Sequence, residues 1–236
     1  MKIGSRTFLS IESIRAFIKK VSPCCNLFFS PCVYRCEAEI NITLTGRHIM
    51  SLAPRKPNEE ELQEATRGFR SGSSAAFQVL YRYHSQSVYR FCLRMVGDPS
   101  SAQDAFQETF IKVFEHHAEF RGDHFPAWLF MIARRVCLNH LRSLKKHDEY
   151  DEEIHGEVTD HRESDIGMKM CIERALLMLP VQLREAAILR EYEGYSYQEI
   201  ASIVGIDLSL AKVRVHRARL LLKKILAPVV QEWYES

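Results

Sequence analysis

Apolar residues recur every three or four positions along two stretches of this chain, residues 58–146 and 165–226. Residues with this spacing share one face of an α-helix, and a helix with one apolar face must bury it against another element. No strand-length run of alternating apolar and polar residues competes with this pattern between residues 58 and 146. We therefore expect an all-α protein made of two small helical domains.

Capping residues predict where several of these helices begin and end. Gly97 is expected to end one helix, and Asp98 followed by Pro99 is typical of the N-cap and first position of the next. Pro126 is expected to open a further helix. The last helix of the second domain is expected to reach about Ile225.

An acidic stretch separates the two domains. Residues 148–165 contain nine Asp or Glu residues and one Arg. A run this polar has too little apolar surface to bury itself, which predicts a flexible acidic linker over residues 147–164. The acids of this linker offset basic helices on either side of it, so the formal net charge of the 236-residue chain is only +2.

The first 49 residues differ from the rest of the chain. Charged residues interrupt their apolar segment, which argues against a secretion signal. Met50 is followed by a polar, proline-containing opening. We expect residues 1–49 to be a non-native or disordered N-terminal extension, with Met50 as the start of the working protein. No uncharged apolar run approaches about 18 residues, so membrane insertion is not expected.

A helix-turn-helix signature lies near the C-terminus. Ser196 and Glu199 have the spacing of a capping box, Gly205 permits a sharp turn, and Asp207 or Ser209 can cap the helix that follows. On that helix the inner face is small and apolar: Ala211, Val215, Ala218 and Leu222. The opposite face is small or basic: Ser209, Lys212, Val213, His216 and Arg217. A recognition helix in the major groove of DNA needs this arrangement.

Positive charge is concentrated on two predicted helices. Residues 208–224 contain six Lys or Arg residues and no acid, and residues 125–146 contain five and no acid. One basic helix alone can be a solvated surface, but two of them together with a capped helix-turn-helix indicate a protein that binds nucleic acid.

Enzymatic and metal chemistry leave no signature in the sequence. No zinc-protease, P-loop or glycine-rich dinucleotide motif is present, so we expect no catalysis and no cofactor. The cysteines near the N-terminus lack paired zinc spacing, and we expect no metal site. Cys92, Cys137 and Cys171 fall on apolar helix faces and are expected in the core. An odd cysteine count in this setting favours the reducing cytoplasm.

Three motifs in one order resemble a known family. The first is the segment 102–114 (AQDAFQETFIKVF), the second joins the turn 120–123 (FRGD) to the segment 128–134, and the third is the segment 212–219 (KVRVHRAR) after the helix-turn-helix. Together they resemble bacterial RNA polymerase sigma factors of the extracytoplasmic-function (ECF) type. The resemblance covers residues 73–146 and 173–224.

The resemblance implies a division of labour between the domains. Residues 58–146 would be sigma region 2, which binds core RNA polymerase and recognises and melts the minus-ten element, and residues 165–226 would be region 4, which reads the minus-thirty-five element. The implied polymerase-binding residues are Asp104, Gln107, Glu108 and Lys112. The implied minus-ten residues are Phe120, Arg121, Asp123, Phe125, Arg134, Asn139, Arg142 and Lys145, with Phe125 as the candidate for stacking on a base of the melted strand. The implied minus-thirty-five residues are Ser196, Ser209, Lys212, Val213, His216, Arg217 and Arg219.

The implied partners are core RNA polymerase, promoter DNA as duplex and as melted single strand, and an anti-sigma factor. One alternative stays open from the residues alone. A stand-alone helix-turn-helix regulator would dimerise through residues 73–146 and bind operator DNA without polymerase. The polar face that carries Asp104 and Lys112 fits this alternative poorly.

Overall fold

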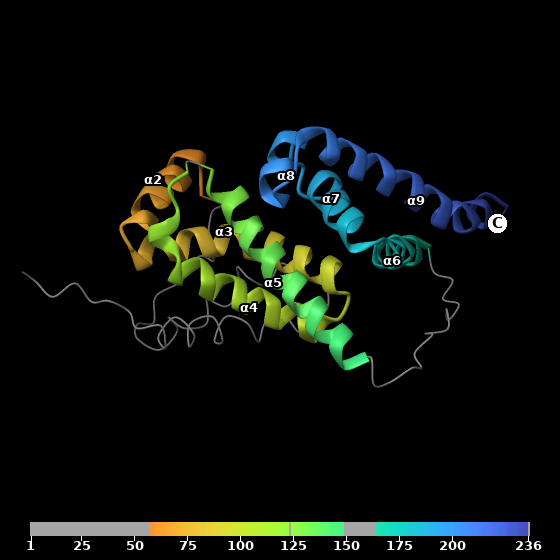
Figure 1. Cartoon of the computed structure of the whole chain (residues 1–236), viewed down its shortest axis with the longest axis horizontal. Helices are drawn as coiled ribbons and strands as arrows, with labels where there is room; N and C mark the ends of the chain where they lie inside the picture. The colour runs from red at the N-terminus through yellow and green to blue at the C-terminus, as the bar shows by residue number, and fades with distance from the viewer. Residues whose placement is uncertain (1–56, 123, 149–163, 236) are drawn as a thin grey trace, which may run out of the picture. The chain divides into compact units, whose positions relative to one another are not determined.

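The structure is a computed structural model that describes residues 57–122, 124–148 and 164–235 (Figure 1). All regular elements among these residues are helices, so the predicted all-α class is confirmed. In chain order they are α2 (Glu59–Arg70), α3 (Ser74–Val96), α4 (Pro99–Glu115), the 3-10 helix η3 (His117–Glu119), α5 (Phe125–Asp148), α6 (Ser164–Leu177), α7 (Val181–Glu191), α8 (Tyr197–Val204) and α9 (Leu208–Glu235). The predicted N-terminal extension, and the predicted linker apart from its two ends, lie outside the described residues.

The predicted helix ends around Gly97 are confirmed by their hydrogen bonds. Gly97 has a φ of 91°, a left-handed conformation that glycine adopts without a side-chain penalty. The Asp98 Oδ2 atom then accepts a hydrogen bond from the backbone N–H of Ser101 at 2.7 Å, which lowers the pKa of the Asp98 carboxyl. Helix α5 begins at Phe125, one residue before the predicted Pro126.

The described residues fall into two compact units, each built on its own core. The first comprises α2, the part of α3 up to Gln86, and residues 110–122, 124 and 125. Aromatic side chains dominate its core: Phe69, Phe77, Tyr81, Phe110, Phe120 and Phe125. The ring centroids of Phe69 and Phe125 lie 5.2 Å apart and those of Tyr81 and Phe110 4.7 Å apart, both with edge-to-face geometry.

The second unit comprises residues 87–109 and all described residues from Pro126 onward. The end of α3 packs on α5 within it, with the rings of Phe91 and Phe130 5.3 Å apart. Cys92 and Cys137 are fully buried here, as expected from their apolar faces, whereas Cys171 is half-buried.

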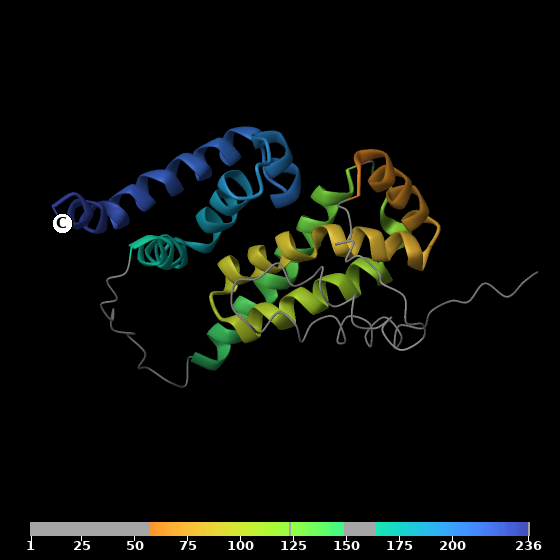
Figure 2. The ribbon, with the colours of Figure 1, turned by 180° about the vertical axis from the view of Figure 1, so that it is seen from behind.

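Helices α6 to α9 of the second unit enclose a small apolar cluster. It contains Leu176, Leu179, Ala187 and Ala218, and α9 lies along α6, α7 and α8 in both views (Figures 1 and 2). Helix α9 is longer than predicted, because it continues past Ile225 and through Pro228 to Glu235. Pro228 lacks only the one N–H that would reach the carbonyl of Lys224, so the backbone continues as a helix beyond it. Among the described helices, none is both long and apolar enough to span a membrane.

Candidate functional site

Capping interactions define both ends of α8, the first helix of the helix-turn-helix. The backbone N–H of Ser196 donates to Glu199 Oε2 at 2.8 Å, and the backbone N–H of Glu199 donates to Ser196 Oγ at 3.3 Å, so the predicted capping box is present. Gly205 ends α8 with a φ of 76°. Helix α8 therefore begins at a hydrogen-bonded capping box, and the turn that follows it begins at a left-handed glycine.

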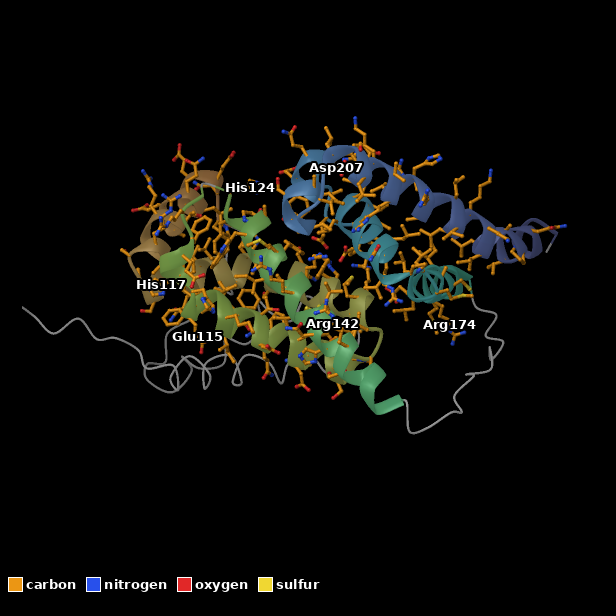
Figure 3. All side chains as sticks on the ribbon, viewed as in Figure 1. Glu115, His117, His124, Arg142, Arg174 and Asp207 are labelled. Carbon is orange, nitrogen blue, oxygen red and sulfur yellow. The ribbon has the colours of Figure 1, made fainter. Side chains whose placement is uncertain are left out.

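Asp207 begins the second helix of this motif (Figure 3). Its Oδ1 atom accepts hydrogen bonds from Ser209 Oγ at 2.6 Å and from the backbone N–H of Leu210 at 2.9 Å. These hydrogen bonds lower the pKa of the Asp207 carboxyl, the one from Ser209 most strongly. Ser209, predicted to face DNA, is thus also part of the N-cap.

The two faces of α9 differ as predicted. Ala211, Val215 and Ala218 are fully buried. The opposite face is exposed along its whole predicted length: Ser209, Lys212, Val213, His216 and Arg217. The Val213 side chain is 41% exposed, which is high for an apolar residue and suits contact with a thymine methyl group in the major groove. Small buried residues let α9 pack closely on its own domain while its basic face stays open to solvent.

The other two residues predicted for this surface have local partners. Ser196 is occupied as the cap of α8. Arg219 forms an ion pair with Glu191 of α7, with Arg219 Nη2 2.7 Å from Glu191 Oε1 and both side chains about half exposed. An exposed pair of this kind is weak, so it leaves Arg219 free to exchange Glu191 for a phosphate.

The polar face of α4 carries the predicted polymerase-binding residues. Asp104 is exposed, and Gln107, Glu108 and Lys112 are half-buried. Glu108 Oε2 lies 3.0 Å from Nε2 of His140 on α5, so the carboxylate has a fixed position. The opposite face of α4 is buried: Ala102, Ala105, Phe106, Phe110 and Val113. Asp104, Glu108 and Lys112 follow one another at intervals of four residues, which aligns them along the helix.

Two phenylalanines predicted to contact the minus-ten element, Phe120 and Phe125, are buried in the structure. Phe120 is 3% exposed and Phe125 is 1% exposed, and both rings pack against Phe69 in the core of the first unit. The ring of Phe125 is enclosed by other aromatic rings, so it would have to leave this core to stack on a base. Trp128, in the first turn of α5, is half-buried.

The remaining predicted minus-ten residues differ in their exposure and in their partners. Arg121, Asn139 and Arg142 are exposed. The side chain of Arg142 is labelled in Figure 3, and its Nη1 atom lies 3.4 Å from Asn139 Oδ1. Arg134 is held in an ion pair with Glu185 of α7, at 2.7 Å from Arg134 Nε to Oε2. Asp123 lies outside the described residues, and so does the side chain of Lys145.

Sequence reasoning missed the buried charges of α7. Glu185 is 1% exposed and Arg184 is 8% exposed, although both are charged. The signal was present in the helix VQLREAAILRE, because Glu185 lies three and four residues before Ile188 and Leu189 and so shares their buried face. The partners of Glu185 lie 51 and 29 residues away in sequence, and no local pattern identifies partners at that separation.

Comparison with known proteins identifies the family. Two family descriptions match the chain: "Sigma-70 region 2" over residues 80–147 and "Sigma-70, region 4" over residues 169–222. The RNA polymerase sigma-H factor of Pseudomonas aeruginosa is 32% identical over 190 residues, which cover 74% of this chain and 98% of the relative. The ECF RNA polymerase sigma factor SigE of Mycolicibacterium smegmatis is 32% identical over 179 residues, which cover 70% of this chain and 68% of the relative.

A solved structure agrees with the sequence relatives. The sigma factor RpoE in complex with the anti-sigma factor NepR, from Bartonella quintana, is 27% identical and has a TM-score of 0.56, covering 64% of this chain and 96% of that one. The matched regions contain the capped α8–α9 turn and most of α4 and α5. The chain belongs to the sigma-70 family of bacterial RNA polymerase sigma factors, in its ECF group.

Proposed function

We propose that this sigma factor, which directs promoter-specific transcription, reads the minus-thirty-five element with the exposed face of α9 and binds core RNA polymerase with the polar face of α4. The observation that carries the proposal is the contrast between the two faces of α9. Its inner face is fully buried at Ala211, Val215 and Ala218. Its outer face presents small and basic side chains over residues 209–217, and the exposed Leu220 follows them. A face of this composition fits base edges and phosphates in the major groove.

Different residues of α9 have different roles in this proposal. Ser209 and Val213 lie in the first turns of the helix, where a recognition helix approaches base edges most closely. Lys212, His216 and Arg217 supply hydrogen-bond donors to bases or phosphates. Ser196 and Arg219, which have intramolecular partners, are assigned to the DNA backbone, where contacts fix position more than sequence.

Helix α4 is proposed as the docking element for the polymerase. One face of α4 carries a polar stripe: Asp104, Gln107, Glu108 and Lys112. The opposite face of α4 is buried and holds the helix in place. Polar side chains in fixed positions suit the rim of a protein interface. The hydrogen bond between Glu108 and His140 supports such a fixed position.

The exposed part of α5 is proposed to follow the melted minus-ten strand. Asn139 and Arg142 are exposed on this helix, and Arg121 is exposed in the loop before it. Cationic and amide side chains that track a single strand supply affinity through its phosphates. Phe120 and Phe125 have no part in this reading, since both rings serve the core.

We also infer that the chain catalyses no reaction of its own and acts in the cytoplasm, where its polymerase partner works. An anti-sigma protein is a further proposed partner, and the Bartonella quintana sigma factor is held by such a protein in its solved complex. Among the described residues no cluster of His, Cys, Asp and Glu is arranged to hold a metal ion.

Reconstituted transcription tests the proposed function. The chain is added to core RNA polymerase with a library of randomised promoters, and the transcribed templates are selected and sequenced. We expect transcripts that require the chain and share two sequence elements. Binding to duplex DNA with no effect on core polymerase would instead identify a stand-alone helix-turn-helix regulator and overturn the proposal.

One substitution tests the assignment of α9. Arg217→Ala should weaken holoenzyme binding to the selected promoter by about 1–3 kcal/mol and relax preference in the upstream element, because a bidentate base contact is lost. Lys224→Ala is the matched control, since Lys224 is an exposed cation farther along the same helix. Equal losses for both variants would show that α9 contributes only general positive charge.

A further inference from the structure

Two arginines of α9 flank its buried face, and each donates a hydrogen bond to a carboxylate of α7. Arg214 Nη1 donates to Glu185 Oε1 at 3.2 Å, and Arg219 Nε donates to Glu191 Oε1 at 2.9 Å. At about 100° per residue, two positions five residues apart lie about 140° apart around the helix axis. The arc between the two arginines contains the buried residues of this part of α9: Ala211, Val215 and Ala218. Helix α9 lies along α7 (Figures 1 and 2), and one ion pair is formed on each side of their apolar contact.

The two ion pairs differ in burial. The side chain of Glu185 is 1% exposed and that of Arg214 is 14% exposed, whereas those of Glu191 and Arg219 are 41% and 50% exposed. An exposed pair in water contributes little and exchanges its partners easily. A buried carboxylate that loses its partner is left without solvation, so a buried pair is costly to break. The Glu185–Arg214 pair is therefore the one that persists when Arg219 turns to a DNA phosphate.

The position of the Glu185 carboxylate is fixed by a further partner on α5. Its Oε2 atom accepts a hydrogen bond from Nε of Arg134 at 2.7 Å, and its Oε1 atom accepts one from Nη2 of the same guanidinium at 3.2 Å. Guanidinium groups that bind a carboxylate through two parallel hydrogen bonds define its orientation as well as its place. Glu185 thus presents Oε1 to Arg214 from a defined position.

The apolar contact of α9 alone does little to fix the rotation of the helix about its own axis. Ala211 and Ala218 are small, and small side chains let two helices approach closely but form only shallow ridges between them. A helix with such a face turns through a small angle with little loss of buried area. A hydrogen-bonded ion pair is directional, and buried polar contacts are the best-attested means of setting the register of packed helices.

The rotation of α9 determines which side chains reach DNA. Arg214 lies between Val213, which is 41% exposed and assigned above to base edges, and the fully buried Val215. A side chain that ends about 5–6 Å from the helix axis moves by about 2 Å when the helix turns by about 20°. Hydrogen bonds to base edges tolerate only a few tenths of an ångström. A small error in rotation therefore costs base contacts even though the domain stays folded.

We propose that Glu185 is a positioning residue for promoter recognition: through Arg214 it fixes the rotation of α9 and so determines which side chains face the minus-thirty-five element. The carboxylate itself stays buried and touches no DNA. Arg214 has a different role from the other cations of α9, since it pairs inward with the protein. This inference rests on the proposed function of α9.

The test measures the promoter selectivity of the complex between the full chain and core RNA polymerase. Selectivity is the ratio of two affinities, one for a promoter with the selected minus-thirty-five element and one for the same promoter with that element scrambled. A variant that merely folds less well lowers both affinities equally and leaves the ratio unchanged. The ratio therefore separates positioning of α9 from a general loss of stability.

Two carboxylates of α7 supply the variant and its control. Glu185→Gln keeps the shape of the side chain and removes its charge. Glu191→Gln makes the same change in the exposed pair between the same two helices. We expect Glu185→Gln to lower selectivity roughly tenfold, the order of one lost base contact, and Glu191→Gln to stay within about twofold of the wild type.

Arg214→Gln tests the same contact from the other helix. The side chain of Arg214 is partly exposed, so this variant carries the test if Glu185→Gln does not fold. Arg214→Gln should lose selectivity to the same extent as Glu185→Gln, and the double variant should lose no more than either single variant, because all three break one contact. Losses that add in the double variant would show that Arg214 reads DNA by itself and would overturn a role of Glu185 through it.

Failure of this inference and failure of the proposed function give different results. A folded Glu185→Gln protein with the selectivity of the wild type would overturn the inference, and so would an equal loss in Glu191→Gln. If the wild type itself does not distinguish the two promoters, α9 does not read the minus-thirty-five element. In that case the proposed function is overturned, together with the inference that rests on it.

Discussion

The two segments assigned to promoter DNA are built in opposite ways. In α9 the DNA-facing residues are exposed and the buried residues are small, so the recognition face is complete without any rearrangement. In the segment around the start of α5, Phe120 and Phe125 are core residues and Arg134 is bound to Glu185. The surface that we propose for the upstream element is therefore exposed in the structure, whereas part of the segment proposed for the downstream element is buried or paired within the protein.

This difference suits the two kinds of nucleic acid that we propose for the segments, duplex DNA for α9 and a melted single strand for α5. Duplex DNA offers a rigid groove, and a rigid helix with a preformed face fits it. A melted strand exists only after polymerase has bound and opened the promoter, so a free chain gains nothing by exposing the residues that hold it. Exposed aromatic rings and unpaired cations would also favour non-specific contacts.

The largest expected effect is on the stability of the folded protein, when the buried ring of Phe125 is removed. Phe125→Ala should lower the free energy of unfolding by about 3–5 kcal/mol, because it empties a site surrounded by Phe69, Phe120 and His84. Chemical denaturation followed by circular dichroism measures this change. Arg121→Ala in the adjoining loop is the control and should change stability by less than about 0.5 kcal/mol. A stable Phe125→Ala protein that fails only in promoter melting would restore Phe125 as a DNA-reading residue.

An effect of intermediate size should be a pH dependence of stability caused by His84, whose ring lies beside Phe125. Burial, with a smaller contribution from the charge of His124, lowers the pKa of His84 from 6.5 to about 4. The unfolded chain therefore binds more protons than the folded chain between these values, and stability falls as the pH drops through this range. Between pH 7 and pH 5 we expect a loss of about 2 kcal/mol from this group, measured by denaturation at both values.

His84→Met is the matched variant for this experiment, because methionine fills a similar buried space and takes up no proton. Its stability should depend less on pH over the same range. If the wild type and His84→Met lose equal stability between pH 7 and pH 5, the buried histidine is not the cause.

The smallest effect concerns the turn that presents α9. Gly205→Ala should destabilise the protein by about 1 kcal/mol, because alanine at a φ of 76° is strained although nothing lies within 4 Å of the added Cβ. Gly205→Asn should lose less, since asparagine tolerates the left-handed conformation better. Thermal unfolding distinguishes the two variants. Equal stability of all three proteins would mean that the turn relaxes away from the left-handed conformation.

Residues whose roles depend on helical periodicity were predictable from the sequence. The buried face of α9, its exposed face, the Ser196–Glu199 capping box and the N-cap at Asp98 all follow from spacing within one or two turns. Local hydrogen bonds and amphipathic faces determine such features, so the printed sequence contains the information needed to find them.

Features that depend on distant partners were not predictable in the same way. The burial of Phe125 depends on Phe69, which comes from another helix, and the ion pairs of Glu185 join α7 to α5 and α9. Helix α9 extends beyond its predicted end near Ile225, because it continues through Pro228 to Glu235. Tertiary packing overrides local preference in each case.

The most direct measurement compares the two halves of one promoter. Equilibrium binding of the free chain, and of its complex with core RNA polymerase, is measured on a duplex carrying the selected upstream element and on a single strand carrying the downstream element. The account predicts that the free chain binds the duplex through α9 and binds the single strand only weakly, and that polymerase raises single-strand affinity by a far larger factor. Single-strand binding by the free chain as tight as that of the polymerase complex would contradict it.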